Sequence, residues 1–171
     1  MCVLTRDEIW RELDSGRLRI EPLERDQVGP ASIDLHMGSE LRVMKPGQNG
    51  PIPVTDDTDP TLFTELIELD EPFVLEPGAT VHGVTRETIY LPSNLCGWLE
   101  GRSRIARLGL TIHVTSGFVH PGVANRQVLE LANVSAVALE LHAGVRVCQI
   151  VLERTVGEAV YSGRFAEQVR P

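Results

Sequence analysis

The chain has few cysteines, no long apolar run and an excess of negative charge. Its three cysteines, Cys2, Cys96 and Cys148, are odd in number, far apart and without a CxxC pair, which argues against a disulfide framework or a zinc cage. No apolar stretch approaches the ~20 residues that span a bilayer. The formal net charge of -8 argues against the broad basic surface of a general nucleic-acid binder. We therefore expect no membrane and no nucleic-acid partner.

The N-terminal residues lack the basic segment followed by an apolar segment that marks a signal peptide, so we expect a cytoplasmic protein. Cys96 and Cys148 lie in apolar runs and are expected to be small buried hydrophobic residues. A length of 171 residues indicates one domain over residues 1–171, with enough chain to bury a sizeable core.

Abundant Val, Leu and Ile, together with 15 glycines and 11 prolines, favour many short strands over long helices. A helix is expected over residues 5–15, with Thr5 and Glu8 as a capping box and Ile9, Trp10 and Leu13 as its apolar face. Residues 46–61 hold four prolines and predict a long loop. The strand candidates are 18–20, 32–38, 41–43, 66–69, 73–75, 79–84, 88–91, 95–100, 111–115, 117–119, 126–132, 136–141 and 145–153.

Short strands at this spacing suggest a mainly β sandwich, barrel or jelly roll with one N-terminal helix. The polar tail, residues 161–171, has too little apolar content for a core element. It is interpreted as a surface arm or a lid, and a frayed terminus is the common alternative.

Residues 101–110 concentrate positive charge on an acidic chain, with Arg102, Arg104 and Arg107 around Ser103. Arginine side chains are well shaped to bind phosphate oxygens. The segment therefore predicts a local anion site, although a solvated turn between two strands explains such a cluster equally well.

Glu130 is the most distinctive carboxylate. Residues 126–133 read as a strand that places Val128, Glu130 and Ala132 on one face and two leucines on the other. A carboxylate between apolar neighbours is partly desolvated, which suits it to proton transfer near neutrality. The alternative is an edge-strand glutamate that points into water.

Several familiar sites are missing from the sequence: the GxxxxGK[ST] phosphate loop, the GxGxxG fingerprint and the HxE…PCxxC signature of zinc nucleobase deaminases. The histidines form no HxH or HxxxH pair, and each is expected to be structural or solvated rather than a metal ligand. They are His36, His82, His113, His120 and His142.

Five blocks in this order resemble the dCTP deaminases of the trimeric dUTPase-like superfamily. Residues 30–38 are similar to PASIDLRLG, and residues 91–110 to LPSNLVGRVEGRSSLARLGL. Residues 113–122 are similar to HVTAGFIDPG, residues 128–133 to TLELxN, and residues 142–150 to xPGMRIGQL. The likeness extends over nearly the whole chain, and the set is far more specific than any one block.

The resemblance implies a distorted β-barrel or jelly-roll protomer that forms a homotrimer with active sites between subunits. It implies zinc-independent hydrolytic deamination of dCTP to dUTP and ammonia. In that reaction Glu130 takes a proton from water and delivers it to the base, while Ser103 and Arg107 hold the water and the developing charge.

The resemblance also implies how the nucleotide is held. Arg102 and the backbone at 103–104 match the part of the family that grips phosphates, and a Mg²⁺ ion is expected on the triphosphate with few or no protein ligands. Tyr161, Arg164 and Gln168 match an arm that folds over the nucleotide, with Arg164 in place of a lysine. The full set of implied nucleotide-binding residues is Arg102, Arg104, Ser116, His120, Val128, Gln149, Tyr161, Arg164 and Gln168.

Three substitutions depart from the family pattern. Arg104 replaces a serine, Ser116 an alanine, and His120 an aspartate that is implicated in cleaving dUTP to dUMP in members that do so. The alternatives are a dUTP diphosphatase or bifunctional enzyme, a non-catalytic nucleotide-binding regulator, and a deaminase of a modified pyrimidine nucleotide.

Overall fold

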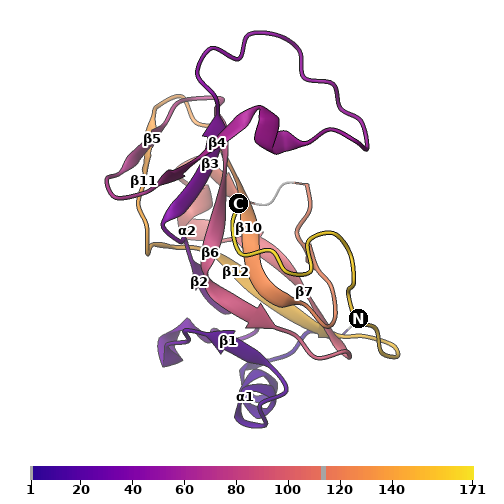
Figure 1. Cartoon of the computed structure of the whole chain (residues 1–171). Coiled ribbons are helices and arrows are strands. Elements are labelled where there is room, and N and C mark those ends of the chain that lie inside the picture. The colour runs from indigo at the N-terminus through magenta and orange to yellow at the C-terminus, as the bar shows by residue number, and fades with distance from the viewer. Residues whose placement is uncertain (1, 113–114) are drawn as a thin grey trace.

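The structure is a computed structural model that describes residues 2–112 and 115–171 (Figure 1). The predicted strand over 111–115 therefore lies partly outside the described residues, and the histidine at 113 lies wholly outside them. The helices are α1 (Arg6–Asp14) and α2 (Ser103–Ala106). The strands are β1 (Arg19–Glu21), β2 (Ile33–His36), β3 (Glu40–Met44), β4 (Thr64–Glu68), β5 (Phe73–Leu75), β6 (Thr80–Tyr90), β7 (Leu95–Gly101), β8 (Leu110–Ile112), β9 (Phe118–Val119), β10 (Ala124–Asn133), β11 (Leu139–Leu141) and β12 (Arg146–Arg154).

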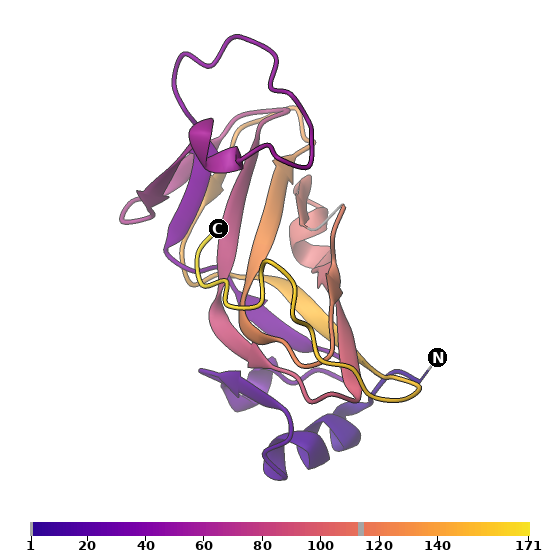
Figure 2. The same ribbon diagram turned by 45° about the vertical axis from the view of Figure 1, so that its right-hand side comes forward.

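Two antiparallel sheets enclose the core (Figure 2). One has the order β4-β3-β6-β10-β8, with β1 also paired to β6, and the other has the order β2-β12-β7-β9. Strands β5 and β11 form a separate pair. Apolar residues alternate along these strands, so one face of each sheet is buried and the other is left for polar side chains. Fully buried members of the core include Ile33, Leu35, Leu41, Leu129, Leu131, Ile150 and Leu152.

The prediction of a mainly β protomer with a short N-terminal helix is confirmed, although the described strands do not close into a barrel. The first sheet ends at β4 and β8, and the second ends at β2 and β9. One isolated bridge, between Met37 and Thr85, links β2's end to β6. The ladder stops there because the chain turns at Gly38, whose amide donates to the Val84 carbonyl (2.7 Å), and continues as β3.

Strand β6 corrects the prediction of two separate strands at 79–84 and 88–91. The polar residues between them, Thr85 to Glu87, continue the strand because Glu87 is buried with its carboxylate satisfied. That carboxylate accepts hydrogen bonds from the His36 amide (2.9 Å) and the Gln27 side chain (3.2 Å), and it contacts the His36 ring. Buried charge is tolerated in a strand when it is paired in this way.

Helix α1 packs Ile9, Trp10 and Leu13 against the core, as predicted. The predicted capping box is wrong, because the Thr5 side chain makes no capping hydrogen bond. Glu8 instead contacts Arg11 one turn later. In the described part of the chain, no helix has the length and apolar character needed to cross a membrane.

We predict that Glu12→Gln destabilises the fold at neutral pH. Glu12 is buried on α1 and accepts from Arg17 and Arg154, each at 2.8 Å. The Arg17 hydrogen bond, supported by Arg154, holds the pKa of this carboxyl below its usual range. A carboxyl whose folded-state pKa is lowered stabilises the fold above the unfolded pKa and loses that contribution as pH falls through the folded pKa. The expected loss is about 1–2 kcal/mol at pH 7, measured by urea unfolding.

The loss should shrink in parallel measurements near pH 3, where the wild-type carboxyl is also becoming protonated. Glu8→Gln is the control, since the Glu8 side chain is partly exposed to solvent, and it should change stability by less than about 0.5 kcal/mol. An equal effect of Glu12→Gln at both pH values would contradict the assignment.

Candidate functional site

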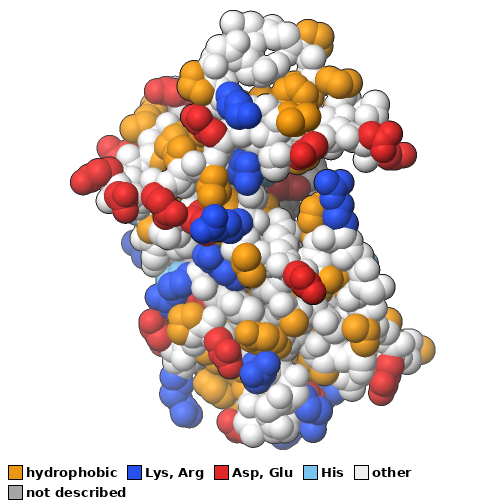
Figure 3. Space-filling model, viewed as in Figure 1, with side chains coloured by type: hydrophobic (Ala, Val, Ile, Leu, Met, Phe, Trp, Pro, Cys, Tyr) orange, Lys and Arg blue, Asp and Glu red, His pale blue; other side chains and the backbone are white. Residues whose placement is uncertain are grey.

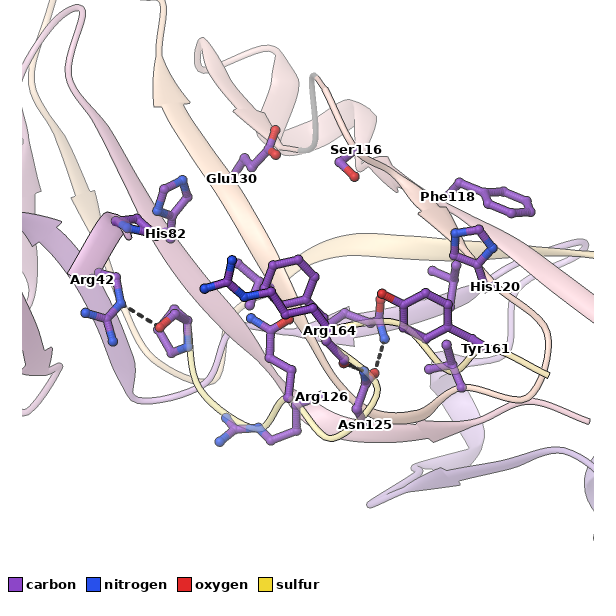
Figure 4. Close-up of a pocket in the computed structure, with 18 of the residues that line it drawn as sticks. Arg42, His82, Ser116, Phe118, His120, Asn125, Arg126, Glu130, Tyr161 and Arg164 are labelled. Atoms are coloured by element: carbon purple, nitrogen blue, oxygen red, sulfur yellow. Dashed lines mark hydrogen bonds between the residues drawn. The ribbon is translucent and has the colours of Figure 1, made fainter. Parts of the chain in front are cut away.

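A cavity of about 620 Å³ opens on the face of the first sheet that is turned away from the core. Strands β3, β6 and β10 form its floor, and residues 116–120 line one wall. The loop before β4 contributes residues 58–61, and the C-terminal segment contributes residues between 161 and 171. Figure 3 shows the molecule hollowed beneath the loop, and Figure 4 shows the side chains within.

Glu130 lies on the cavity floor, on the face of β10 that the alternation in the sequence predicts. On β10, Val128 and Glu130 line the cavity while Leu129 and Leu131 are buried on the opposite face. The Glu130 carboxylate is half-buried, and its Oε2 accepts from the amide (3.2 Å) and the hydroxyl of Thr115. Among the described residues no hydrogen bond reaches Oε1. One oxygen is thus anchored while the other is available to a ligand.

Two further polar side chains stand in register with Glu130. In the antiparallel pairing His82 of β6 lies opposite Glu130 of β10, and Arg42 of β3 lies opposite His82. Directly opposed residues project from the same face of a sheet. Figure 4 shows His82 and Glu130 projecting from neighbouring strands on the cavity side.

The cavity is rich in positive charge although the chain is acidic. Arg42, Arg126 and Arg164 line it, against the carboxylates of Asp59 and Glu130. Arg42 donates to the Pro171 carbonyl (2.7 Å), while Arg126 donates to the Val169 carbonyl (3.2 Å). In Figure 4 the Arg164 side chain extends across the middle of the cavity. This arrangement suits an anionic ligand.

Asp59 projects from the long loop, whose role the sequence did not indicate. The Thr61 hydroxyl (2.8 Å) and amide (2.9 Å) donate to it and hold the pKa of that carboxyl below its usual range, with smaller contributions from the charges of Arg164 and Arg42. The predicted loop over 46–61 is thereby confirmed as irregular up to its last residues and also forms a wall of the site.

His120 lies in an aromatic row. Its ring stacks on Tyr161 at 4.9 Å between centroids and 8° between planes, and the edge of the row continues through Phe118 to Trp98. His120 therefore packs against the first residue of the C-terminal arm.

The arm, residues 161–171, lies along β10 and borders the cavity. The Tyr161 amide donates to the Pro121 carbonyl (2.9 Å), the Arg126 amide to the Gln168 carbonyl (3.2 Å), and the buried Asn125 side chain to the Phe165 carbonyl (2.8 Å). The interpretation of this segment as a lid over a ligand stays a prediction.

The structure divides the predicted site residues into two sets. Seven line the cavity: Ser116, His120, Val128, Glu130, Tyr161, Arg164 and Gln168. Five others contribute nothing to the lining among the described residues: Arg102, Ser103, Arg104, Arg107 and Gln149.

The second set lies around α2, a helical turn that the sequence did not predict. Ser103, Arg104 and Arg107 are exposed, and α2 packs beside β8 at the sheet edge. Arg102 forms an ion pair with Asp34 (2.9 Å) and donates to the Arg146 carbonyl (3.2 Å).

Gln149 accepts from the Ser32 hydroxyl (2.6 Å) and donates to the Gly101 carbonyl (3.3 Å). It thereby ties β12 to the strand that leads into α2. Among the described residues, the cavity of one chain is therefore lined by the first set alone.

Sequence reasoning missed several cavity residues. Arg42, His82 and Arg126 each stand at polar positions of an alternating strand, which is the one signal that could have drawn attention to them. Asn125 and Thr115 carry no comparable signal, because an isolated amide or hydroxyl is common in any strand or loop.

The residues present do not form a metal cage. No group of three or more His, Cys, Asp or Glu side chains that could hold a metal ion occurs within residues 2–112 and 115–171. Asp59 is committed to Thr61 and Glu130 to Thr115. This donor set fits an ion carried by a ligand's phosphates.

Cys96 and Cys148 are buried as predicted, and burial raises the pKa of both thiols.

Comparison with known proteins gives one consistent family. A family model described as dCTP deaminase-like matches residues 3–155. A protein of Parafrankia sp. named "dCTP deaminase, dUMP-forming" is 37% identical over 99% of this chain and 88% of its own length.

Solved structures share the fold. The 2'-deoxycytidine 5'-triphosphate deaminase of Agrobacterium tumefaciens aligns over 88% of this chain with a TM-score of 0.68 and 25% identity; this chain spans about half, 47%, of that one. A mutant dUTPase from phage phi11 of S. aureus, whose description mentions a structural Mg(II) ion, aligns over 86% of this chain and 96% of its own with a TM-score of 0.54 and 13% identity, a likeness of fold.

We predict that Asn125→Ala loosens the arm without unfolding the protein. The buried Asn125 amide holds the Phe165 carbonyl, and its loss leaves that segment with fewer anchors. Hydrogen exchange of residues 161–171 should speed up by about fivefold to tenfold, equivalent to about 1 kcal/mol of local opening. Asn94→Ala, outside the cavity, should leave this exchange unchanged. Unaltered protection in Asn125→Ala would show that the contact does not hold the arm.

Proposed function

The chain belongs to the dCTP deaminase-like family, and from this premise we propose that it catalyses the hydrolytic deamination of dCTP. The observation that carries the proposal is the Glu130 carboxylate, which is anchored through one oxygen on the floor of a cation-lined cavity. The cations suit a triphosphate, and the carboxylate suits a reaction that starts by taking a proton from water.

The proposed reaction adds water to C4 of the cytosine. Glu130 takes one proton from the water as the water oxygen bonds to C4. The protonated Glu130 then delivers that proton to N3 of the cytosine. The remaining hydroxyl proton is then transferred to the exocyclic amine, the C4–N4 bond breaks, and ammonia leaves with its electron pair. The overall change is dCTP plus water to the uracil nucleotide plus ammonia, and it needs no redox partner. Independence from zinc is part of this proposal.

The second set of residues enters the proposal through a homotrimer. Ser103 and Arg107 would hold the water and the developing charge from a neighbouring copy, and Arg102, with the 103–104 backbone, would hold phosphates. Support comes from the exposure of Ser103 and Arg107 outside the cavity of their own chain. Arg104 has no assigned role beyond its place on this surface. A cytoplasmic location and the lack of a nucleic-acid partner remain predictions from composition.

We further propose that Mg²⁺ enters with the nucleotide. Bound to the triphosphate, it would neutralise part of the phosphate charge. The arginines Arg42 and Arg164 would bind the phosphate oxygens that the ion leaves free, and no described cluster of carboxylates competes for the ion.

The product is the finer point. We propose dUTP, because His120 stands where members that form dUMP use an aspartate. The His120 ring is packed on Tyr161 and offers no carboxylate to a second water. A bifunctional enzyme that goes on to dUMP is the second candidate, favoured by the dUMP-forming name of the Parafrankia relative.

We predict that Glu130→Gln abolishes deamination, because the amide cannot accept the proton. We expect kcat to fall by about 10²-fold to 10⁴-fold. Glu65→Gln on β4, outside the cavity, should retain activity. Size-exclusion chromatography with light scattering should find the same oligomer in the wild type and in both variants. Substantial turnover by Glu130→Gln would remove Glu130 from the mechanism.

Product analysis decides between the candidates. Purified protein incubated with dCTP and Mg²⁺ should release one ammonia per dUTP, without pyrophosphate. Release of pyrophosphate together with dUMP would establish the bifunctional alternative. Tight binding of dCTP without ammonia would indicate a regulator and would overturn the proposed function.

A further inference from the structure

The last residues of the arm lie on two of the arginines that line the cavity. The Nε of Arg42 donates to the main-chain oxygen of Pro171 (2.7 Å), a bond that the dashed line at Arg42 marks in Figure 4. A terminal nitrogen of Arg126 donates to the Val169 carbonyl (3.2 Å). Both arginines of the cavity therefore bind main-chain oxygens of residues 169–171.

A buried carboxylate holds this end of the arm in place. Glu40 is 6% exposed, and its Oε1 lies 3.0 Å from the Nε of Arg170, while its Oε2 lies 3.4 Å from Arg126. Among the described residues Oε1 accepts no hydrogen bond, so the Arg170 guanidinium is the group beside it that offsets its charge. Because an unpaired buried charge is costly, this ion pair stabilises the docked position of residues 169–171.

A triphosphate in the cavity would need the same donors. The Nε–H of Arg42 is a single donor, so it cannot serve Pro171 and a phosphate oxygen at full strength together. Arg126 uses its Nε–H on the Thr85 carbonyl (2.6 Å), which leaves its terminal nitrogens, and one of these is bound to Val169. A guanidinium binds a phosphate oxygen more strongly than an uncharged main-chain oxygen such as that of Val169. The phosphates and the end of the arm are therefore competitors.

We propose that residues 169–171 form an autoinhibitory contact, which competes with the triphosphate for the cavity arginines and is stabilised by the Glu40–Arg170 ion pair. This inference rests on the proposed function, in which a triphosphate binds in this cavity. Nucleotide binding then requires residues 169–171 to leave both arginines, which lowers the apparent affinity by the fraction of molecules in which they are docked. The rest of the arm, residues 161–168, is held by hydrogen bonds that use neither guanidinium, so it can stay docked.

The first test is the binding of inorganic tripolyphosphate with Mg²⁺, measured by isothermal titration calorimetry. Arg170→Gln removes the ion pair and should strengthen binding by about twofold to fivefold, the effect of losing one partly exposed pair. Arg170→Lys keeps a positive charge beside Glu40 and should bind as the wild type does. Loss of a positive charge by itself weakens the binding of an anion, so a gain in Arg170→Gln reports release of the arginines.

The matched control is Arg11→Gln. Arg11 is an exposed arginine that also contacts a glutamate, Glu8, but both residues belong to α1 and lie outside the cavity. This variant loses the same charge and should bind tripolyphosphate as the wild type does. Weaker or unchanged binding in Arg170→Gln would overturn the proposal, because the end of the arm would then assist the anion or leave the arginines accessible to it.

A second measurement follows the contact itself and separates this proposal from the proposed function. In NMR spectra the Nε–H proton of Arg42 should exchange with water about twofold to fivefold faster in Arg170→Gln than in the wild type. The Nε–H of Arg126, bound to the Thr85 carbonyl of the sheet, should exchange at the same rate in both. Unchanged exchange at Arg42 would refute the autoinhibitory contact even in an active deaminase. Success of both tests in a protein that does not turn over dCTP would refute only the proposed function.

Discussion

The antiparallel pairing of β6 with β10 determines which side chains face the cavity. It places Leu129 and Leu131 in the core and Glu130 on the open face opposite His82. Because side chains alternate along a strand, a slip of one residue would bury the glutamate and expose the leucines. The burial of these leucines therefore stabilises the fold and fixes the orientation of the candidate catalytic group with the same contacts.

Much of this could be predicted from the sequence, where the information was local. Alternation around Glu130 gave the correct faces of β10, and the Pro-rich segment gave the correct loop. The errors arose where distant residues decide. The break predicted in β6 ignored Glu87, whose partners Gln27 and His36 are far away in sequence.

Only part of the candidate site could be predicted from the sequence. The family resemblance gathered Glu130, Ser103 and Arg107 into one mechanism, but within one chain the last two stand on the exposed turn α2. The cavity walls supplied by Asp59 and Arg164 depend on how a loop and an arm fold back over the sheet. No local pattern encodes that arrangement.

Two glutamates of the first sheet show how the fold treats carboxylates differently. Glu87 is fully buried and accepts from His36 and Gln27, so its charge is paired within the fold. Glu130 is half-buried and its described hydrogen bonds come from Thr115 alone, through one oxygen. Folding stability explains the first arrangement, because an unpaired buried charge is costly. It does not explain the second, which leaves hydrogen-bonding capacity directed at a cavity, and that surplus capacity is what a ligand or a reacting water can use.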